Sequence, residues 1–200
     1  MRVVLGLLIL FCLPARPAAA QWRIGLELAD TRYRGSAHDT SSTTTHPDAR
    51  PGSATMVGLR FSRGWGRWGR WGAAVRASYG KTRFSLGMKQ LEVTTGGTGR
   101  LLEFAGLVST RVGGIGSSGA ARVELGPALH LWDFDEEIRA RLGALGALSY
   151  EWPVAGRVSG SVRLEGTLSK SWFNAADVPP EFERRVTWRY GVGLSVSYRL

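Results

Sequence analysis

The stretch that decides the fold is residues 186–200, Val-Thr-Trp-Arg-Tyr-Gly-Val-Gly-Leu-Ser-Val-Ser-Tyr-Arg-Leu. Every even-numbered position in it holds an aliphatic or aromatic residue, and the odd-numbered positions hold only Thr, Arg, Gly and Ser. A period of two residues is that of a β-strand with one apolar face and one polar or small face. The segment therefore predicts a long two-faced strand.

The same alternation of large apolar with small or polar residues recurs seven times upstream. The seven segments are residues 22–29, 57–62, 71–79, 102–112, 122–131, 138–150 and 158–168. Segment 138–150 also suits a helix because it is rich in Ala and Leu, but its neighbours favour a strand. We expect eight strands, each near the roughly 9–11 residues that a tilted strand needs to cross a bilayer.

The first twenty residues are typical of a secretory signal peptide. Arg2 precedes an apolar run over residues 3–13, and Ala18-Ala19-Ala20 offers a cleavage site before Gln21. The run is shorter than the roughly 20 residues that a membrane-spanning helix requires. We therefore predict a signal peptide over 1–20 and a mature barrel domain over 21–200. Cys12, the single cysteine, belongs to the signal, so a disulfide scaffold is excluded.

The predicted connections differ in length at the two ends of the strands. Short glycine-rich turns over 63–70, 113–119 and 153–156 alternate with longer loops over 30–54, 81–100 and 173–185, while 133–137 is short. Short turns on one side and long loops on the other are typical of outer-membrane barrels, whose turns face the periplasm. The predicted fold is all-β, an eight-stranded antiparallel up-and-down transmembrane β-barrel with both termini periplasmic.

Aromatic residues cluster at the ends of the predicted strands. Rings at strand ends suit the headgroup level of a bilayer, so we expect two aromatic girdles. The predicted girdle residues are Trp22, Trp65, Trp68, Trp71, Trp132, Trp152, Trp172, Trp188 and Tyr198, with Tyr33 at the outer end.

The polar face of the strands combines Gly, Ala and Ser with isolated Arg and Glu. Small residues with a few long charges suit the interior of an eight-stranded barrel, which side chains just fill. Buried charges must be paired, so we predict a network of salt bridges inside. Its predicted members are Arg23, Glu27, Arg60, Arg76, Glu103, Arg111, Arg122, Glu124, Arg139, Arg141, Arg163, Glu165 and Arg189.

Signal peptide, eight strands and an alternating last strand resemble the small outer-membrane β-barrel family of the OmpX and OmpA transmembrane type. The resemblance covers nearly the whole mature chain and implies fold and cellular place more than activity. It also implies that the last strand is the signal read by the barrel-assembly machinery. That strand ends in Leu where the family usually has Phe. The residues carrying the signal would be Tyr190, Gly193, Val196, Tyr198 and Leu200.

Other candidate sites have simpler interpretations. His130 is followed two residues later by Trp132 rather than by the Ser of an outer-membrane lipid-A deacylase, and its parity directs it into the lumen. His38 and His46, with two nearby Asp residues, match no metal-ligand spacing and suit a solvated loop. The acidic tip 133–137 also suits solvent, although it offers carboxylates that could bridge cations to lipopolysaccharide phosphates.

The formal net charge of +10 and the eight Trp residues are compatible with nucleic acid or a membrane, and export favours the membrane. The Arg-Trp turn at 63–71 therefore suits an interfacial anchor. We expect a non-enzymatic monomer with a structural, adhesive or protective role and no cofactor or metal. Its partners would be outer-membrane lipids, lipopolysaccharide and, during biogenesis, the assembly machinery. A narrow anion-preferring pore, a lipid-modifying enzyme and a secreted ligand-binding barrel are the alternatives.

Overall fold

The computed structural model describes residues 21–40, 48–66, 69–87, 92–114, 119–134, 137–174, 180 and 182–200. The predicted signal peptide over 1–20, together with Trp68 and His46, lies outside the described residues. Among the residues that the structure describes, no helix is long and apolar enough to cross a membrane.

Strands make up nearly all of the described chain. They are β1 (Gln21–Asp39), β2 (Asp48–Pro51), β3 (Ala54–Trp65), β4 (Trp71–Gly87), β5 (Glu92–Gly113), β6 (Ala120–Phe134), β7 (Glu137–Ala155), β8 (Val158–Ser169) and β9 (Phe182–Arg199).

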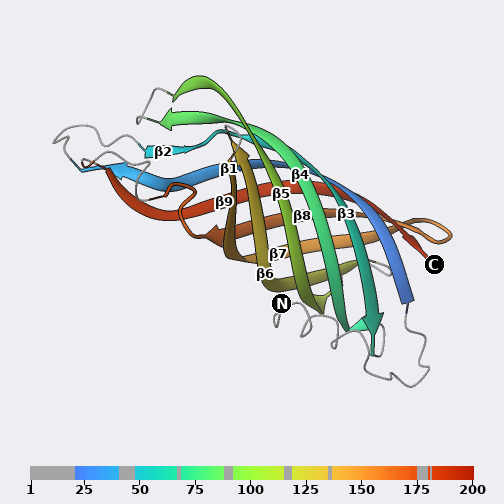
Figure 1. Cartoon of the computed structure of the whole chain (residues 1–200). Coiled ribbons are helices and arrows are strands. Elements are labelled where there is room, and N and C mark those ends of the chain that lie inside the picture. The colour runs from blue at the N-terminus through green and yellow to red at the C-terminus, as the bar shows by residue number, and fades with distance from the viewer. Residues whose placement is uncertain are drawn as a thin grey trace.

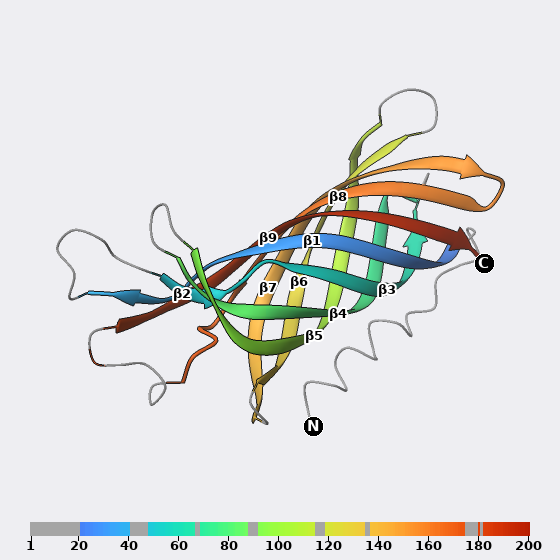
Figure 2. The same ribbon diagram turned by 90° about the horizontal axis from the view of Figure 1, so that it is seen from above.

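The strands form one antiparallel sheet that closes on itself (Figures 1 and 2). From β3 onward each strand pairs with the next along the chain, and β9 pairs with β1 to complete the ring. Short β2 lies between β1 and β4, the same two neighbours that flank β3, so β2 and β3 share one position in the ring. Across the break between them, the Gly52 N–H donates to the Arg83 carbonyl at 2.6 Å. The ring therefore has eight strand positions, which confirms the predicted fold.

All three connections at the end of the barrel that holds the first residues of β1 and the last residues of β9 are short. The turn after β7 contains Gly156 with φ of +52°, and the connection after β3 contains Gly66 and Gly69 at +81° and +61°. These are left-handed conformations that favour glycine. We call this end the terminal end.

The opposite end differs from the prediction, because several strands continue into segments that we expected to be loops. β1 runs on to Asp39, β5 begins at Glu92 and β9 begins at Phe182. The extensions pair with each other, as Ala37 does with Arg184. Backbone hydrogen bonds stabilise these extensions without the apolar alternation that marks the rest of each strand. We call this end the extended end.

The apolar faces of the strands point away from the lumen. Leu26 and Leu194 are 62% and 61% exposed, whereas Arg76 and Glu103 are 1% and 0% exposed. This arrangement is the reverse of a soluble barrel, which has its apolar face inside. Three leucines, Leu101, Leu107 and Leu145, nevertheless point inward and are buried. The last two pack with small Ala side chains, so one wall of the lumen is apolar.

Candidate functional site: the barrel lumen

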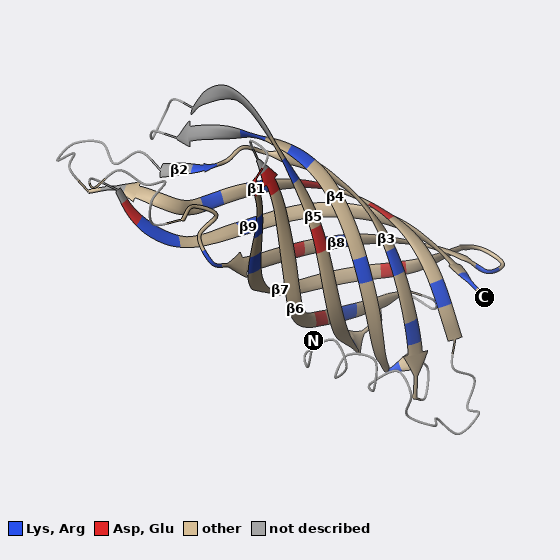
Figure 3. Cartoon of the chain, in the orientation of Figure 1, with Lys and Arg blue, Asp and Glu red and all other residues tan. Residues whose placement is uncertain are grey.

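Eight charged side chains meet in the middle of the lumen, and we call them the central cluster. They come from seven strands and comprise equal numbers of basic and acidic groups. They are Glu27, Arg60, Arg76, Glu103, Glu124, Arg163, Glu165 and Arg189. In Figure 3, basic (blue) and acidic (red) positions lie along the middle part of the strands. All eight were predicted as lumen residues. Because four Arg face four Glu, the formal charge of the cluster is balanced.

Arg76 on β4 is the most deeply buried cation of the central cluster, and it reaches three carboxylates. Its Nη1 lies 2.6 Å from Glu165 Oε2, and its Nε lies 2.8 Å from Glu27 Oε2. A third carboxylate, Glu103, lies 3.8 Å from the same Nη1. A guanidinium at 1% exposure is stable only when its charge and its donors are satisfied, and this one reaches carboxylates on three other strands.

The remaining cations extend the central cluster to both sides of Arg76. Arg60 donates two hydrogen bonds to Glu124, at 2.7 and 3.0 Å, in the paired geometry that makes Arg–carboxylate contacts strong. The Nη1 of Arg163 lies 2.7 Å from Oε2 of the same carboxylate. Arg189 lies 2.6 Å from Glu103. Each carboxylate is shared, so the eight groups form one connected network.

His130 on β6 belongs to this network and faces the lumen. Its Nε2 lies 2.8 Å from Glu103 Oε2, and the side chain is buried. A histidine that attacks lipid would have to lie on the outer face beside a serine. The position of His130 makes it a partner of Glu103 instead.

An aromatic layer closes the lumen toward the extended end. Trp132 contacts Tyr33 edge-on, with ring centroids 5.7 Å apart, and Trp172 at 5.5 Å; Trp172 in turn contacts Phe173 at 5.1 Å. Met56 and Leu101 are buried in the same cluster. These residues fill the lumen between the central cluster and the extended end, and we call them the aromatic plug.

The aromatic plug corrects part of the girdle prediction. Trp132 and Trp172 are 1% and 2% exposed, and Tyr33 is buried with them, so none of the three faces outward. Trp132 points inward because it has the same parity on β6 as the inward-facing His130. Trp172 lies after β8 in a segment that folds back into the barrel mouth, as its burial against Trp132 requires.

Arg141 on β7 holds that inward-folded segment in place. Its guanidinium donates to the Ser171 carbonyl at 2.8 Å, the Trp172 carbonyl at 3.1 Å and Asn174 Oδ1 at 2.6 Å. Ser171 Oγ donates to the Ser36 carbonyl on β1 at 2.7 Å. The segment is thus tied to both walls of the mouth.

Five predicted lumen residues lie outside the central cluster. Arg139 pairs with Glu137 at 2.6 Å near the extended end, and Arg141 binds the folded segment. Arg23 and Arg122 both contact Glu151 near the terminal end. The prediction of a single network is therefore wrong in extent, because side chains at the two mouths are too far along the strands to reach the middle.

Arg111, the fifth residue outside the central cluster, donates to two backbone carbonyls, those of Gly113 and Gly119, near the terminal end. Glu151 was not among the predicted members. Its odd number places it on the same face of β7 as Ser149, which is the signal that could have found it.

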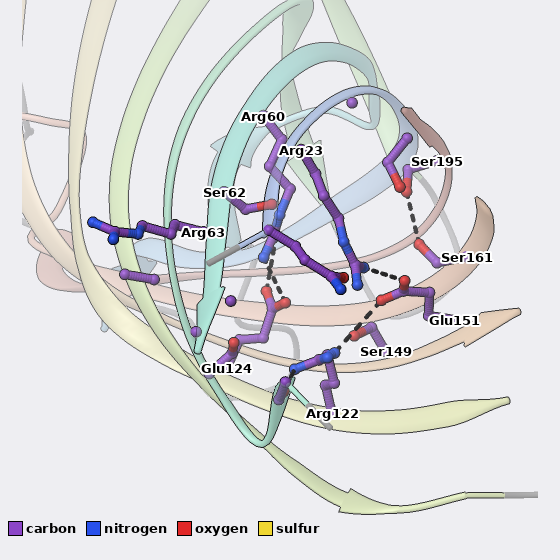
Figure 4. Close-up of a pocket in the computed structure, with 18 of the residues that line it drawn as sticks. Arg23, Arg60, Ser62, Arg63, Arg122, Glu124, Ser149, Glu151, Ser161 and Ser195 are labelled. Atoms are coloured by element: carbon purple, nitrogen blue, oxygen red, sulfur yellow. Dashed lines mark hydrogen bonds and ion pairs between the residues drawn. The ribbon is translucent and has the colours of Figure 1, made fainter. Parts of the chain in front are cut away.

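A cavity of about 520 Å³ opens at the terminal end, below the central cluster (Figure 4). Arg23, Arg60 and Arg122 line it together with Glu124 and Glu151. Serine hydroxyls form much of the remaining polar wall of the cavity. The hydroxyls of Ser161 on β8 and Ser195 on β9 lie 2.7 Å apart. The lumen is thus filled in its middle and toward the extended end, and is hollow at the terminal end.

The remaining girdle aromatics that are described lie on the outer face. The exposed ones are Trp65, Trp71, Trp152, Trp188 and Tyr198. Trp22 is half-buried because it stacks on Phe61 with ring centroids 4.8 Å apart, and the Arg63 guanidinium lies 5.0 Å from its ring. Trp68 lies outside the described residues.

The last strand, β9, closes the barrel between β8 and β1. Tyr190, Val196, Tyr198 and Leu200 are exposed on its outer face. Gly193 lies where a Cβ would come within 3.2 Å of the Ala29 Cβ, so a small residue is needed there. The role of these five residues as an assembly signal remains a prediction.

Among the described residues, no three His, Cys, Asp or Glu side chains gather as metal ligands. His38 lies near the end of β1, and His46 is outside the described residues.

No family model and no curated protein matches the chain. Its fold is similar to that of the outer membrane protein OprG from Pseudomonas aeruginosa, at 16% identity and a TM-score of 0.60, covering 90% of this chain and 96% of that chain. Neisserial surface protein A is similar at 12% identity and a TM-score of 0.51, with 88% and 96% covered. The chain has the fold of the small eight-stranded outer-membrane β-barrels.

Proposed function

We propose that the protein is an integral barrel of the outer membrane of a Gram-negative-type cell, with both termini in the periplasm. It has no catalytic or conducting role in this proposal. It acts through the strands that extend beyond the bilayer, in a structural, adhesive or protective capacity. We propose that it does so as a monomer.

The observation that carries the proposal is the filled lumen. Arg76 and Glu103 in the central cluster and Trp132 in the aromatic plug are each no more than 1% exposed. A water-filled channel would leave solvent against such side chains. The central cluster and the aromatic plug follow each other along the axis, so an ion would have to break both. This favours a sealed barrel over the narrow anion-preferring pore.

The outer face supports insertion in a bilayer. On β9, the exposed rings of Trp188 and Tyr198 bracket Val192, Leu194 and Val196. Ten residues rise about 33 Å along a strand, which is about 25 Å along the axis of a barrel whose strands tilt by about 40°. That height matches the apolar band of outer-membrane barrels. The short turns at the terminal end support a periplasmic location for that end.

Basic residues at the extended end support contact with lipopolysaccharide. Arg32 and Arg34 on β1, and Lys81 and Arg83 on β4, are exposed just beyond the apolar face. The Arg34 guanidinium lies 5.7 Å from the ring of Tyr190, at the edge of the aromatic girdle. Cations directly above interfacial rings are positioned for lipid phosphates. We propose that this belt binds the phosphates of the outer leaflet.

Membrane fractionation and conductance test the proposal. The protein should appear in the outer-membrane fraction and migrate faster on a gel before boiling than after it. Planar-bilayer recordings should show no stepwise current for the wild-type barrel. Recovery in the soluble periplasmic fraction would contradict the location. Reproducible anion-selective steps would contradict the sealed lumen and favour the pore.

Lipopolysaccharide binding can be tested separately. The Arg32→Gln/Arg34→Gln variant should bind lipopolysaccharide aggregates less tightly than wild type. Arg70→Gln, an exposed position at the opposite end, is the control and should bind as wild type does. Equal loss in both variants would indicate general charge attraction rather than a belt.

A further inference from the structure

The cavity at the terminal end has an excess of positive charge that the barrel itself does not balance. It adjoins a smaller hollow of about 180 Å³, and Arg23, Arg122 and Glu151 line both. The smaller hollow adds Arg111, Arg157 and Arg199. Five guanidinium groups and one carboxylate therefore line the smaller hollow at this mouth. The central cluster behind them is neutral as a whole, and its Glu27 and Glu124 line the larger cavity together with Arg60 and Arg163.

Pairing across the strands brings these cations directly opposite one another. Arg23 on β1 is paired in register with Arg199 on β9. Arg111 on β5 is paired with Arg122 on β6. Like charges directly opposite on neighbouring strands destabilise a sheet. Two such pairs at one mouth mean that the repulsion is repeated on both sides of the cavity.

The contacts already present do not remove this repulsion. Glu151 is shared between Arg23 and the Nε of Arg122, which lies 3.5 Å from its Oε2. Arg122 also donates to the Gly69 carbonyl at 3.0 Å, and Arg111 to the Gly119 carbonyl at 3.2 Å. A carbonyl accepts a hydrogen bond but carries no formal charge. The cations are thus held in place without being neutralised.

The cavity also offers hydroxyl donors beside the cations. Ser149, Ser161 and Ser195 line it from three neighbouring strands. Figure 4 shows Ser149 beside Glu151 and Arg122, and Ser161 beside Glu151. Arginine guanidinium groups and serine hydroxyls together are the donors that bind phosphate oxygens. A concave site with walls of low dielectric concentrates the field of its charges, which favours a multiply charged anion.

We infer that this mouth is a binding site for a soluble phosphate-bearing solute, which enters from the end of the barrel that carries the termini. The ligand has at least two negative charges and fits within about 520 Å³. Its phosphate contacts Arg23 and Arg122 from the cavity, beside the Glu151 carboxylate that bridges them, and offsets the like-charged pairs. The site depends on the barrel fold and not on the proposed role of the extended end.

Calorimetric titration with inorganic pyrophosphate tests the site in protein refolded in a zwitterionic detergent. Wild type should bind saturably. Arg23→Gln and Arg122→Gln should each weaken binding about 10- to 100-fold, the range expected when a hydrogen bond to a charged group is lost. The matched control is Arg184→Gln, an exposed position at the extended end, which should bind as wild type does. Absence of saturable binding, or equal weakening in the control, would overturn the proposal.

Glu151→Gln gives a test with the opposite sign. Removing the only carboxylate among the five cations should lower thermal stability without ligand and increase the rise in unfolding midpoint that pyrophosphate produces. A smaller pyrophosphate-induced rise than in wild type would overturn the proposal. Heat-modified gel migration of each variant reports that the barrel has formed, so a folding failure is detected independently.

The phosphate of a lipid headgroup shares this chemistry, and the membrane environment separates the two sources. The titration is repeated in nanodiscs with zwitterionic lipid alone and in nanodiscs that contain phosphatidylglycerol. Equal pyrophosphate affinity in both supports a soluble ligand inside the ring. Loss of binding in the anionic discs would assign the cations to lipid headgroups and overturn the proposal.

Discussion

Replacing Glu103 with Gln perturbs the central cluster with almost no change in shape. The Glu103 side chain is fully buried, with Arg189 at 2.6 Å and His130 at 2.8 Å. Arg76 Nη1 lies 3.8 Å away, and the Ser78 hydroxyl donates to it at 3.3 Å. The variant removes one of four negative charges, so the central cluster changes from neutral to a net charge of one positive.

The expected cost follows from the partners that remain. Arg189 keeps Glu165 at 3.3 Å, so it retains one carboxylate at longer range. Removing one member of a buried charge pair costs about 3–5 kcal/mol because the other charge is left buried and uncompensated. Since Glu165 compensates Arg189 in part, we expect the lower half of that range, about 3–4 kcal/mol.

Equilibrium unfolding in urea, followed by Trp fluorescence in lipid vesicles, measures this cost. The matched control is Glu183→Gln, which removes a carboxylate 3.3 Å from Arg185 in a pair that is more than half exposed. An exposed pair contributes about 0–1 kcal/mol. The difference between the two variants isolates the effect of burial from that of the substitution.

A double variant checks that charge balance is the cause. Glu103→Gln with Arg189→Gln restores a neutral cluster, so its cost should be well below the sum of the two single costs. Strict additivity would mean that the two side chains do not interact in the folded barrel. Equal stability of Glu103→Gln and Glu183→Gln would refute the reasoning altogether.

Three further predictions concern packing. Gly126→Ala should lower the free energy of urea unfolding by about 1–3 kcal/mol, because a Cβ there would lie 1.9 Å from the Gly106 carbonyl oxygen. The control is Gly166→Ala, whose Cβ would meet no atom within 4 Å and which should be nearly neutral. Trp172→Ala removes the buried ring of the aromatic plug and should cost about 3–5 kcal/mol in the same assay; a cost under 1 kcal/mol would contradict its burial. Arg141→Ala should speed amide exchange over residues 171–174 about tenfold or more, as measured by mass spectrometry, because three hydrogen bonds are lost.

Periodicity predicted most of the barrel because the lipid-facing and lumen-facing sides of a strand differ in residue type. The same parity also predicts the correct face for Trp132. Its position on β6 is even-numbered, like that of the inward-facing His130. The error there came from assigning Trp by residue type to the membrane surface. Glu151 was missed although the same parity places it inward, between two outward-facing aromatic residues, Tyr150 and Trp152.

Two features had no periodic signal in the sequence. Trp172 lies between strands, where no alternation indicates which way a side chain points, and only the fold brings it to Trp132. The strand extensions at the extended end are rich in Ser, Thr and Gly, and their pairing depends on backbone hydrogen bonds. Contacts among the charges were also beyond prediction, because parity gives the face of a residue but not its partner across the lumen.

The central cluster is better explained by specification of the fold than by stabilisation. A buried ion pair contributes little net stability compared with apolar groups of the same volume. A strand that slips by one residue exchanges its two faces, however, and would turn Arg76 toward lipid. An arginine at the bilayer midplane costs about 2–4 kcal/mol, and its carboxylate partners would be left unpaired as well. An apolar lumen would carry no such penalty, because either face could then meet lipid. The charges therefore define which face of each strand points inward, and the balance of four Arg with four Glu lets them do so without a net charge in the lumen.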